Sequence, residues 1–393
     1  MPAEHRKTVI INAISLNLGG GRSIRDSYLR VLNEDRLNER YVVFVAKGTT
    51  PAGIDNPMIE ILELPSLYSK TIIVPFAHRH ILRHYFKRYC ADVVLNFSDV
   101  ILRTDVKQIY VFDNAYLLDV DPGVFLGMEP YLRLSVWAKR LVHRLWLHEP
   151  AVVVAQTELA REALIKKYGL ADVRIIGNAV TVEAPSIISG HDYTLPDGIR
   201  LLYPATYYPH KNHEVLLKVA EAIKARKLDY RIVTTIAAES VGARRFLAKI
   251  MERGLGSVIV NLGHVPLPQM PDLYRQCQGM LMPTLLESFS ISYPEAMHHH
   301  LPIFTSDLDF ARAVCGEAAR YFDPLDADEI LRSIEDVFTD AERKHALVEA
   351  GARRLKDILG WPEVYAAYQS LIHEQLYGPS RAAHPHPAPA SRG

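Results

Sequence analysis

The sequence has few cysteines and no long uncharged apolar run. Its three cysteines, Cys90, Cys277 and Cys315, are widely spaced and form no CxxC pair. They fit a reducing compartment and predict neither a disulfide framework nor a zinc site. No uncharged apolar stretch reaches the roughly 18 residues that a membrane-spanning helix needs. The N-terminus carries an early acid and runs into a strand-like segment, unlike a signal peptide. We expect a cytoplasmic protein.

The sequence also lacks an excess of charge of either sign. Lys+Arg and Asp+Glu number 45 each, so the net charge gives no indication of nucleic-acid binding, and we expect no nucleic-acid partner. Apolar residues make up 49% and charged residues 23%, which is typical of a globular protein. Because 393 residues are too many for one ordinary core, two domains are expected.

Short β-branched segments alternate with amphipathic helical stretches along the whole chain. The segments that predict buried strands are TVIINAIS, YVVFVA, DVVLNF, KQIYVF and AVVVAQ in the first half, and RLLYPA, YRIVTTI, SVIVNL, GMLMP and ARYFD in the second. Such alternation predicts parallel sheets covered by helices on both faces. The predicted fold class is therefore α/β, with two tandem doubly wound, Rossmann-like domains that face a cleft.

The pattern is interrupted once, between the two domains. Residues 181–200 lose the alternation and are rich in Pro, Gly, Ser and Asp, which predicts a linker. An N-terminal domain over 1–180 and a C-terminal domain over 201–360 follow from that boundary.

The end of the chain predicts a helix and then a tail. Trp361, Tyr365 and Tyr368 share one helical face, so residues 361–378 are expected to dock on the body of the protein. Residues 379–393 have no periodicity and contain much Pro and Ala, so we expect disorder there.

The stretch ESFSISYPEA places two acids, Glu287 and Glu295, after a predicted strand and around a predicted helix start. A helix that begins near Ser290 tolerates Pro294 in or near its first turn. The backbone N–H groups of Ser290 and Ile291 would then suit a phosphate, and the Glu295 carboxylate could accept two hydrogen bonds from a diol. The alternative is a helix-start acid followed by an ordinary surface acid.

Two further segments fit a phosphate ligand. Lys211, in YPATYYPHKNHEVLL, precedes a predicted helix and could place a charge beside a phosphate, although it could equally be a solvated loop lysine. The triple glycine of LNLGGGRSIRD would let the backbone approach a ligand closely. It is not the dinucleotide pattern GxGxxG, because Ile24 stands where the third glycine is required, and a Rossmann dehydrogenase is disfavoured.

In this order, these segments resemble the nucleotide-sugar glycosyltransferases of the GT-B fold, in particular the large retaining group known as family 4. The resemblance covers roughly residues 8–376. It rests on GGG, HKN and the two glutamates of ESFSISYPEA, with support from RIIGNAV, NLGHVPL, LPIFTSDLDFARAVCGEAARYFDP and GWPEVYAAY.

The resemblance implies catalytic roles for three residues and a binding role for a fourth. Glu287 corresponds to the glutamate that lies against the donor sugar, and Lys211 to the lysine that neutralises the departing diphosphate. Asp113, in YVFDNAYL, corresponds to a residue that faces the sugar. Glu295 corresponds to the glutamate that holds the ribose hydroxyls.

The resemblance also implies the rest of the donor site. The N–H groups of Ser290 and Ile291 would bind the diphosphate, and Gly20 and Gly21 would approach it from the opposite domain. Val265, in the NLGHV loop, would contact the base.

The implied reaction is transfer from a nucleotide-diphosphate sugar to a glycan or a lipid-linked glycan, with retention and without a metal or other cofactor. Front-side attack is expected, so Glu287 is not a covalent nucleophile. The expected setting is the biosynthesis of a bacterial surface polysaccharide such as O-antigen, capsule or lipopolysaccharide. A non-catalytic nucleotide- or glycan-binding subunit, or a GT-B sugar-nucleotide epimerase or hydrolase, is the alternative.

The sequence departs from the family pattern at three points. Ser290 stands where the family usually has a glycine after the first glutamate, which only mildly restricts the loop. No arginine precedes Lys211 in ATYYPH, so one phosphate partner is missing unless His210 or Arg22 replaces it. His300 stands where the family has a glycine, and a left-handed conformation there would be tolerated better by His than by most residues. The adjacent His298 and His299 point about 100° apart on a helix, so no metal cluster is expected.

Two segments, 77–89 and 131–148, are basic and aromatic and contain no acid. One interpretation is docking on an anionic membrane surface, on its inner face and near a lipid-linked acceptor. The other is a pair of helices with solvated basic faces and aromatic residues in the core.

Overall fold

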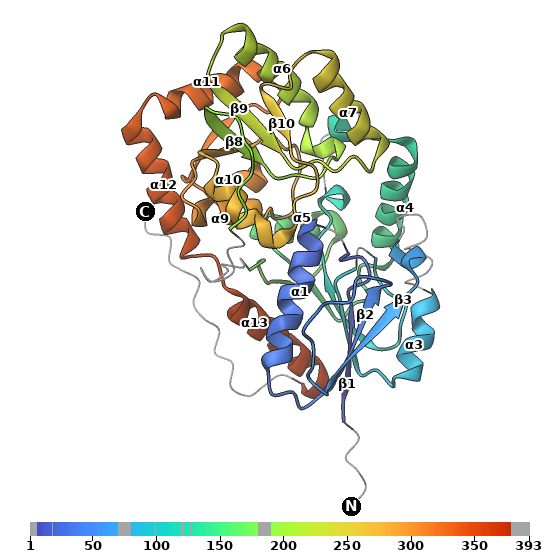
Figure 1. The fold of residues 1–393 in the computed structure, drawn as a ribbon. Helices are drawn as coiled ribbons and strands as arrows, with labels where there is room; N and C mark the ends of the chain where they lie inside the picture. Colours follow the sequence, from blue (N-terminus) through green and yellow to red (C-terminus); the bar gives the residue numbers. More distant parts are fainter. Residues whose placement is uncertain are drawn as a thin grey trace, which may run out of the picture.

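A computed structural model describes residues 6–17, 19–69, 80–98, 100–118, 122–125, 128–179 and 190–378. These residues form two parallel sheets, one between residues 8 and 175 and the other between residues 199 and 322. Figure 1 shows the first domain, coloured blue to green, below the second, coloured green to orange. The predicted pair of doubly wound α/β domains is confirmed. None of the helices in the described ranges is long and apolar enough to cross a bilayer.

The first sheet has the strand order β3-β2-β1-β4-β5-β6-β7, with every pairing parallel. Its strands are β1 (Thr8–Asn12), β2 (Arg40–Ala46), β3 (Ile59–Leu64), β4 (Val93–Asn96), β5 (Lys107–Val111), β6 (Val152–Ala155) and β7 (Val173–Ile175). Five coincide with predicted segments. The hydrophobic pattern does not predict the two edge strands, because β3 is half-exposed and carries acids while β7 has only three residues.

The second sheet has the order β10-β9-β8-β11-β12-β13 and is also parallel. Its strands are β8 (Ile199–Tyr203), β9 (Tyr230–Thr234), β10 (Ile259–Asn261), β11 (Gly279–Met282), β12 (Ile303–Ser306) and β13 (Ala319–Phe322). The missed strand, β12, has two apolar residues followed by Thr and Ser. In both sheets the order reverses beside the first strand, and ligands of such sheets bind in the crevice at that point.

Helices cover both sheets. In the described part of the first domain they are α1 (Gly19–Glu34), α3 (Leu82–Arg88), α4 (Pro130–Trp146) and α5 (Glu158–Tyr168). In the second they are α6 (His213–Ala225), α7 (Val241–Glu252), α8 (Met270–Arg275), α9 (Ser292–His298), α10 (Asp309–Cys315), α11 (Ala327–Phe338) and α12 (Ala341–Leu355). The sequence pattern does not predict α10 and α12.

The last helix, α13 (Trp361–Tyr377), returns to the first domain (Figure 1). The rings of Tyr365 and Tyr368 lie 5.5 and 5.8 Å from that of Tyr28 in α1. The Tyr365 hydroxyl donates to Asp35 at 2.6 Å, and the Tyr41 hydroxyl donates to Gln369 at 2.8 Å. The helix thus closes the core of the first domain. The predicted tail, 379–393, lies outside the described residues, as does 180–189 at the predicted linker.

In NHEVLLKVAEAIKA the spacing of Leu216, Ala220 and Ile223 predicts one apolar face of α6, and Asn212 is the predicted N-cap; the first prediction is confirmed and the second is wrong. Leu216, Ala220 and Ile223 form a buried apolar face, as predicted. Asn212 stands at the N-cap position but its side chain does not cap the helix. It has a φ of 54°, and its amide donates instead to the carbonyls of Pro283 and Pro324. Asn212 therefore ties the start of α6 to two neighbouring loops.

Candidate functional site

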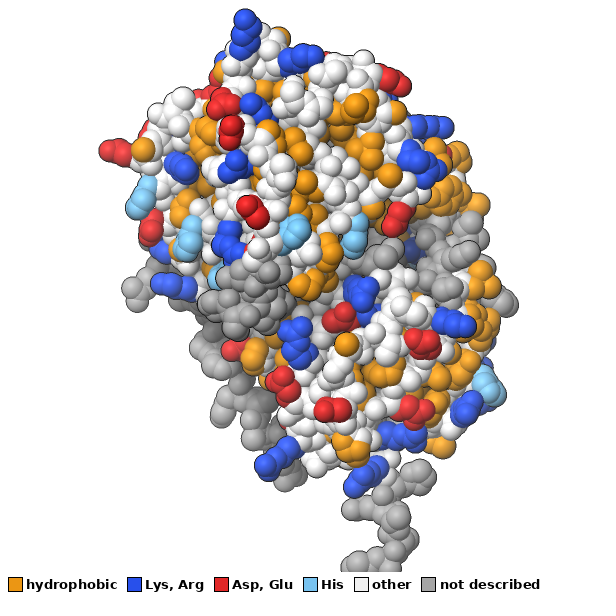
Figure 2. Space-filling model, viewed as in Figure 1, with side chains coloured by type: hydrophobic (Ala, Val, Ile, Leu, Met, Phe, Trp, Pro, Cys, Tyr) orange, Lys and Arg blue, Asp and Glu red, His pale blue; other side chains and the backbone are white. Residues whose placement is uncertain are grey.

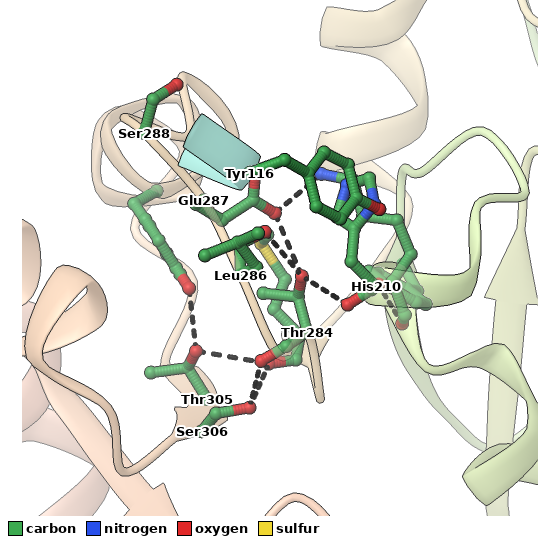
Figure 3. A network of polar contacts seen from close by, with 12 residues as sticks. Tyr116, His210, Thr284, Leu286, Glu287, Ser288, Thr305 and Ser306 are labelled. Carbon is green, nitrogen blue, oxygen red and sulfur yellow. Dashed lines mark hydrogen bonds and ion pairs between the residues drawn. The ribbon is translucent and has the colours of Figure 1, made fainter. Parts of the chain in front are cut away.

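Glu287 lies in the loop between β11 and α9, at the carboxyl edge of the second sheet. The loop is held by Thr284, whose hydroxyl donates to the His210 carbonyl at 3.2 Å and to Glu287 at 3.1 Å. The Ser306 hydroxyl, at the end of β12, donates to the Thr284 carbonyl at 2.6 Å. Figure 3 shows Thr284 at the centre of this network, between Glu287 and His210 on one side and Thr305 and Ser306 on the other. The position of the Glu287 carboxylate is therefore fixed by its own domain.

Lys211 and Glu287, 76 positions apart in the chain, form an ion pair with 2.5 Å between Nζ and Oε1. Lys211 ends the short helix η6 (Pro209–Lys211), and the Tyr203 hydroxyl donates to its carbonyl at 2.5 Å. The side chains of Lys211 and Glu287 are largely buried, at 17% and 10% exposure. An anionic ligand at this edge would compete with Glu287 for the ammonium group, and charge-assisted contacts of this kind are strong.

Glu295 lies in α9, and its Oε2 accepts a hydrogen bond from the Tyr274 hydroxyl of α8 at 2.8 Å. Burial and the nearby Glu295 charge raise the pKa of Tyr274 well above its ordinary value, so the phenol keeps its proton and donates. The ring of His299 stacks on Tyr274 with 5.1 Å between centroids. Tyr274 therefore orients the carboxylate. The sequence gives no sign of this contact, because Tyr274 lies 21 positions from Glu295 on another helix.

The loop ahead of α9 contains the two predicted main-chain donors. The helix begins at Ser292, two residues later than predicted, with Ile291 at the N-cap position and Pro294 in the first turn. The Ser290 side chain is buried. The first N–H groups of a helix have no acceptor within it, so this end presents donors. The roles of Ser290 and Ile291 stay predictions.

His300 follows α9 with a φ of 55°, a left-handed position that favours glycine. In the described part of the chain, no group of three or more His, Cys, Asp or Glu residues is arranged to hold a metal ion.

Asp113 follows β5 and reaches the second domain. Its carboxylate accepts a hydrogen bond from the Ser288 hydroxyl at 2.7 Å. It also lines a cavity of about 10 Å³, roughly the size of one water molecule, together with Gln156 and Asn178. The Asn178 amide donates to Gln156 at 3.0 Å, and both side chains are buried. Gln156 and Asn178 were not among the predicted site residues, although each is a polar residue shortly after a strand.

Tyr116 makes a second contact across the cleft, to the imidazole of His210. Asn114 caps the short helix η3 (Ala115–Leu117) that carries Tyr116. Burial and the charge of Lys211 lower the pKa of His210 well below its ordinary value, so its imidazole is neutral. His210 therefore does not replace the charge of the missing arginine. Arg22, the other candidate to replace the arginine, pairs with Asp26 of its own helix α1, with 3.5 Å between Nε and Oδ2.

The triple glycine forms the first turn of α1. Gly19 begins the helix with a φ of 52°. A Cβ at Gly20 would have no atom within 4 Å, whereas a Cβ at Gly21 would lie 3.1 Å from Leu16. Gly20 is thus open to a ligand, and Gly21 allows the helix to pack on Leu16.

Val265 lies in the loop between β10 and η7 (Leu267–Gln269), but its side chain is buried in the core of the second domain. Its main chain is the part left to meet a base, and its role stays a prediction.

Residues 194–354 match the family model described as glycosyl transferases group 1. The matched range contains Lys211, Val265, Glu287 and Glu295. The second domain belongs to the glycosyl transferases group 1 family. It is this domain that holds both the ion pair and the Tyr274–Glu295 contact.

Two curated relatives carry glycosyltransferase names. One is D-inositol 3-phosphate glycosyltransferase of Paenarthrobacter aurescens, 23% identical over 242 residues, which are 58% of each chain. The other is O-antigen chain mannosyltransferase B of Escherichia coli, 28% identical over 145 residues, which are 34% of this chain and 36% of that one. The chain thus spans between about a third and three fifths of the length of these relatives.

Solved structures share the fold over nearly the whole chain. Sucrose-phosphate synthase of Thermosynechococcus elongatus superposes with a TM-score of 0.73 at 14% identity, covering 94% of this chain and 99% of that one. HepE of Anabaena, in complex with UDP and glucose, gives 0.66 at 13% identity, covering 94% and 99%. At such identities the likeness shows the fold alone, which is GT-B.

Proposed function

We propose that this protein is a retaining glycosyltransferase that moves a sugar from a nucleotide-diphosphate sugar to a hydroxyl of a glycan or lipid-linked glycan. The observation that carries the proposal is the Lys211–Glu287 ion pair at the carboxyl edge of the group 1 domain. It supplies a cation for a diphosphate and a carboxylate for a sugar, side by side and largely shielded from water.

The leaving diphosphate sets the main electrostatic demand of the reaction. As the bond between the anomeric carbon and the phosphate oxygen breaks, negative charge grows on the diphosphate, and the Lys211 ammonium stabilises it. The acceptor oxygen forms its bond on the same face of the sugar, and its proton passes to the departing phosphate oxygen. Glu287 then faces a sugar with oxocarbenium character. A preorganised contact of this type is worth about 10²–10³ in rate.

The nucleoside is bound through Glu295, whose carboxylate accepts hydrogen bonds from the ribose hydroxyls. Tyr274 supports this role because its hydroxyl fixes the carboxylate before the ligand arrives. The N–H groups of Ser290 and Ile291, together with Gly20 and Gly21, complete the diphosphate site, and the loop at Val265 meets the base.

The first domain receives the acceptor. Asp113 faces the group 1 domain, and the buried amides of Gln156 and Asn178 line the cavity that Asp113 also lines. The Asp113 carboxylate suits a hydroxyl of a glycan, whereas the cavity itself has room for about one water molecule. The name of one relative, an O-antigen chain mannosyltransferase, supports a place in surface polysaccharide biosynthesis.

The reaction is proposed to need no metal, because Lys211 supplies the positive charge at the diphosphate. Turnover with and without EDTA tests this. Equal rates are expected, and a loss that added Mg²⁺ restores would contradict it.

A non-catalytic nucleotide-binding subunit is the second candidate. Two observations favour it: no arginine precedes Lys211, and His210 is neutral. The diphosphate site therefore has less positive charge than the family pattern provides. A binding subunit would bind a nucleotide and release nothing.

Calorimetric binding of UDP, GDP, ADP and dTDP tests the site. We expect one nucleoside diphosphate to bind clearly better than the others, and Glu295→Ala to weaken it by about tenfold because a charged hydrogen-bond acceptor is lost. Glu252→Ala, an exposed acid at the end of α7, is the matched control and should change nothing. If no nucleotide binds the wild type, the donor site is wrong.

Turnover then separates the two candidates. Release of the nucleoside diphosphate from a matching sugar nucleotide, with membrane-extracted glycolipids as acceptors, is expected for the transferase. Tight nucleotide binding without release, in the presence of any such acceptor, would favour the binding subunit.

A further inference from the structure

Helix α4 of the first domain carries an apolar face that no described part of the chain covers. Leu134, Trp137 and Leu145 are 60%, 61% and 55% exposed, and Tyr131 and Leu141 are exposed beside them. Spacings of three and four residues place these side chains in one stripe along the helix. Figure 2 shows apolar side chains gathered at the right edge of the view, where Figure 1 places α4. Contiguous apolar surface of this kind marks an interaction site.

The exposed stripe belongs to a helix that is firmly seated. On its opposite face Ser135, Lys139, Val142 and His143 are buried. The Nε2 atom of His143 lies 2.7 Å from the Tyr110 hydroxyl of β5, so a buried hydrogen bond fixes the rotation of α4. The helix cannot turn its apolar stripe inward without breaking that contact.

The charges beside the stripe select the partner. Residues 130–148 contain no acid, and Arg133 and Arg144 lie exposed along one edge of the stripe. Two copies of α4 packed face to face would bring these arginines together, and an electropositive protein surface would be repelled. A surface with an apolar interior and anionic groups at its boundary complements both the apolar stripe and the two arginines.

We infer that the exposed face of α4 docks on an anionic lipid bilayer. Leu134, Trp137, Leu141 and Leu145 would enter the boundary between head groups and acyl chains, and Arg133 and Arg144 would meet lipid phosphates. Trp suits this depth because its ring is apolar and its N–H is polar.

Docking through α4 also positions the cleft. Arg140 donates from the same helix to the carbonyl of Tyr116 at 2.9 Å, and Tyr116 contacts His210 across the cleft. The first turn of α4 begins beside Glu129, which lies 3.8 Å from Arg245 of the second domain. A bilayer at α4 would thus lie beside the mouth of the donor site. The consequence that membrane-anchored acceptors are within reach rests on the proposed transferase function.

Helix α3, in the other basic segment, does not share these features. Leu82 and Phe86 are buried, and Arg83 pairs with Asp105 at 2.7 Å. Residues 77–79 lie outside the described ranges. The proposal is therefore limited to α4.

Flotation of the full chain with lipid vesicles is the test. Binding is expected to vesicles of equal parts phosphatidylcholine and phosphatidylglycerol, and to be much weaker with phosphatidylcholine alone. The double substitution Trp137→Gln with Leu141→Gln should weaken binding by more than about tenfold. Arg144→Gln should weaken it by about fivefold, the usual weight of one basic residue at an anionic surface.

Met251→Gln is the matched control, because Met251 is 74% exposed on α7 of the second domain and should not affect flotation. The emission of Trp137 gives an independent signal. Anionic vesicles should shift the fluorescence to shorter wavelength, and Trp137→Phe should abolish the shift although Trp146 and Trp361 remain.

Two outcomes would overturn the inference. One is the absence of binding to anionic vesicles. The other is a lipid-independent dimer, seen by light scattering, that the α4 double substitution separates into monomers. Nucleotide binding is measured on the same samples without lipid. If the protein binds nucleotide but not anionic vesicles, only the docking proposal is refuted. If it binds anionic vesicles but no nucleotide, only the donor site is refuted.

Discussion

The two domains hold their candidate functional groups in different ways. In the second domain each reactive side chain is fixed by a neighbour from the same domain, as Lys211 is by Glu287 and Glu295 is by Tyr274. In the first domain Asp113 and Tyr116 each make a contact across the cleft, to Ser288 and His210. The donor site is therefore assembled within one domain, whereas the contribution of the other depends on how closely the domains approach.

The largest expected effect concerns the donor site of the second domain. Lys211→Ala should lower kcat by about 10²–10³, because the diphosphate loses its preorganised cation. Lys211→Arg should restore part of the rate, since the charge returns in a different shape. Steady-state kinetics with a donor and acceptor pair measures this. A Lys211→Ala enzyme with normal kcat would place the cation elsewhere, Arg22 being the first residue to examine.

The second expected effect concerns acid stability and rests on a buried histidine of the second domain. Burial lowers the pKa of His213, in the second domain, to about 3, so the folded protein holds it neutral. The unfolded chain takes up a proton below its ordinary pKa of about 6.5, and the free energy of unfolding falls with pH down to about 3. Between pH 7 and pH 5 this loss is about 2 kcal/mol.

Urea unfolding of His213→Phe provides the check. The new ring would sit between the aromatic rings of Tyr203 and Phe246 and cannot take up a proton. Its stability should therefore depend less on pH than that of the wild type, by about 2 kcal/mol over the same interval. An unchanged dependence would mean that His213 does not titrate as described.

A smaller effect is expected from the residue that orients Glu295. Tyr274→Phe should raise the donor KM by about threefold to tenfold with little change in kcat, since a hydrogen bond to a charged group is lost. A 2′,3′-dideoxynucleotide should bind wild type and variant alike, because the ribose contact is absent in both. Tyr321→Phe, which removes a hydroxyl that donates to Gly316, is the control. Equal loss with both nucleotides would indicate a general structural role.

An effect of similar size is expected from the contact between the domains. Ser288→Ala removes the hydrogen bond to Asp113 but leaves the charge of the Asp113 carboxylate in place. The nucleotide binding constant should therefore stay within about twofold, while turnover falls by about threefold to tenfold. Comparison of the binding constant with kcat measures this. A large loss of nucleotide affinity would show that the donor site is not confined to the second domain.

Much of the second domain could be predicted because its signals are local. GMLMP followed by Glu287, and Lys211 ahead of an amphipathic helix, each place a side chain at the carboxyl end of a strand within a few residues. The short strand β12 was missed because it has only two apolar residues. The predicted N-cap at Asn212 is wrong because its side-chain amide donates instead to the carbonyls of Pro283 and Pro324, more than 70 positions away.

The sequence by itself determined the alternation of strands and helices, the two α/β domains, and the polar residues at their strand ends, because hydrophobic periodicity and turn residues act over a few positions. Only the tertiary structure decided that Tyr274 orients Glu295, that Tyr116 meets a neutral His210, that α13 returns to the first domain, and that the apolar stripe of α4 faces outward. These depend on burial and on contacts between distant segments, which fix both the pKa values and the exposed surface.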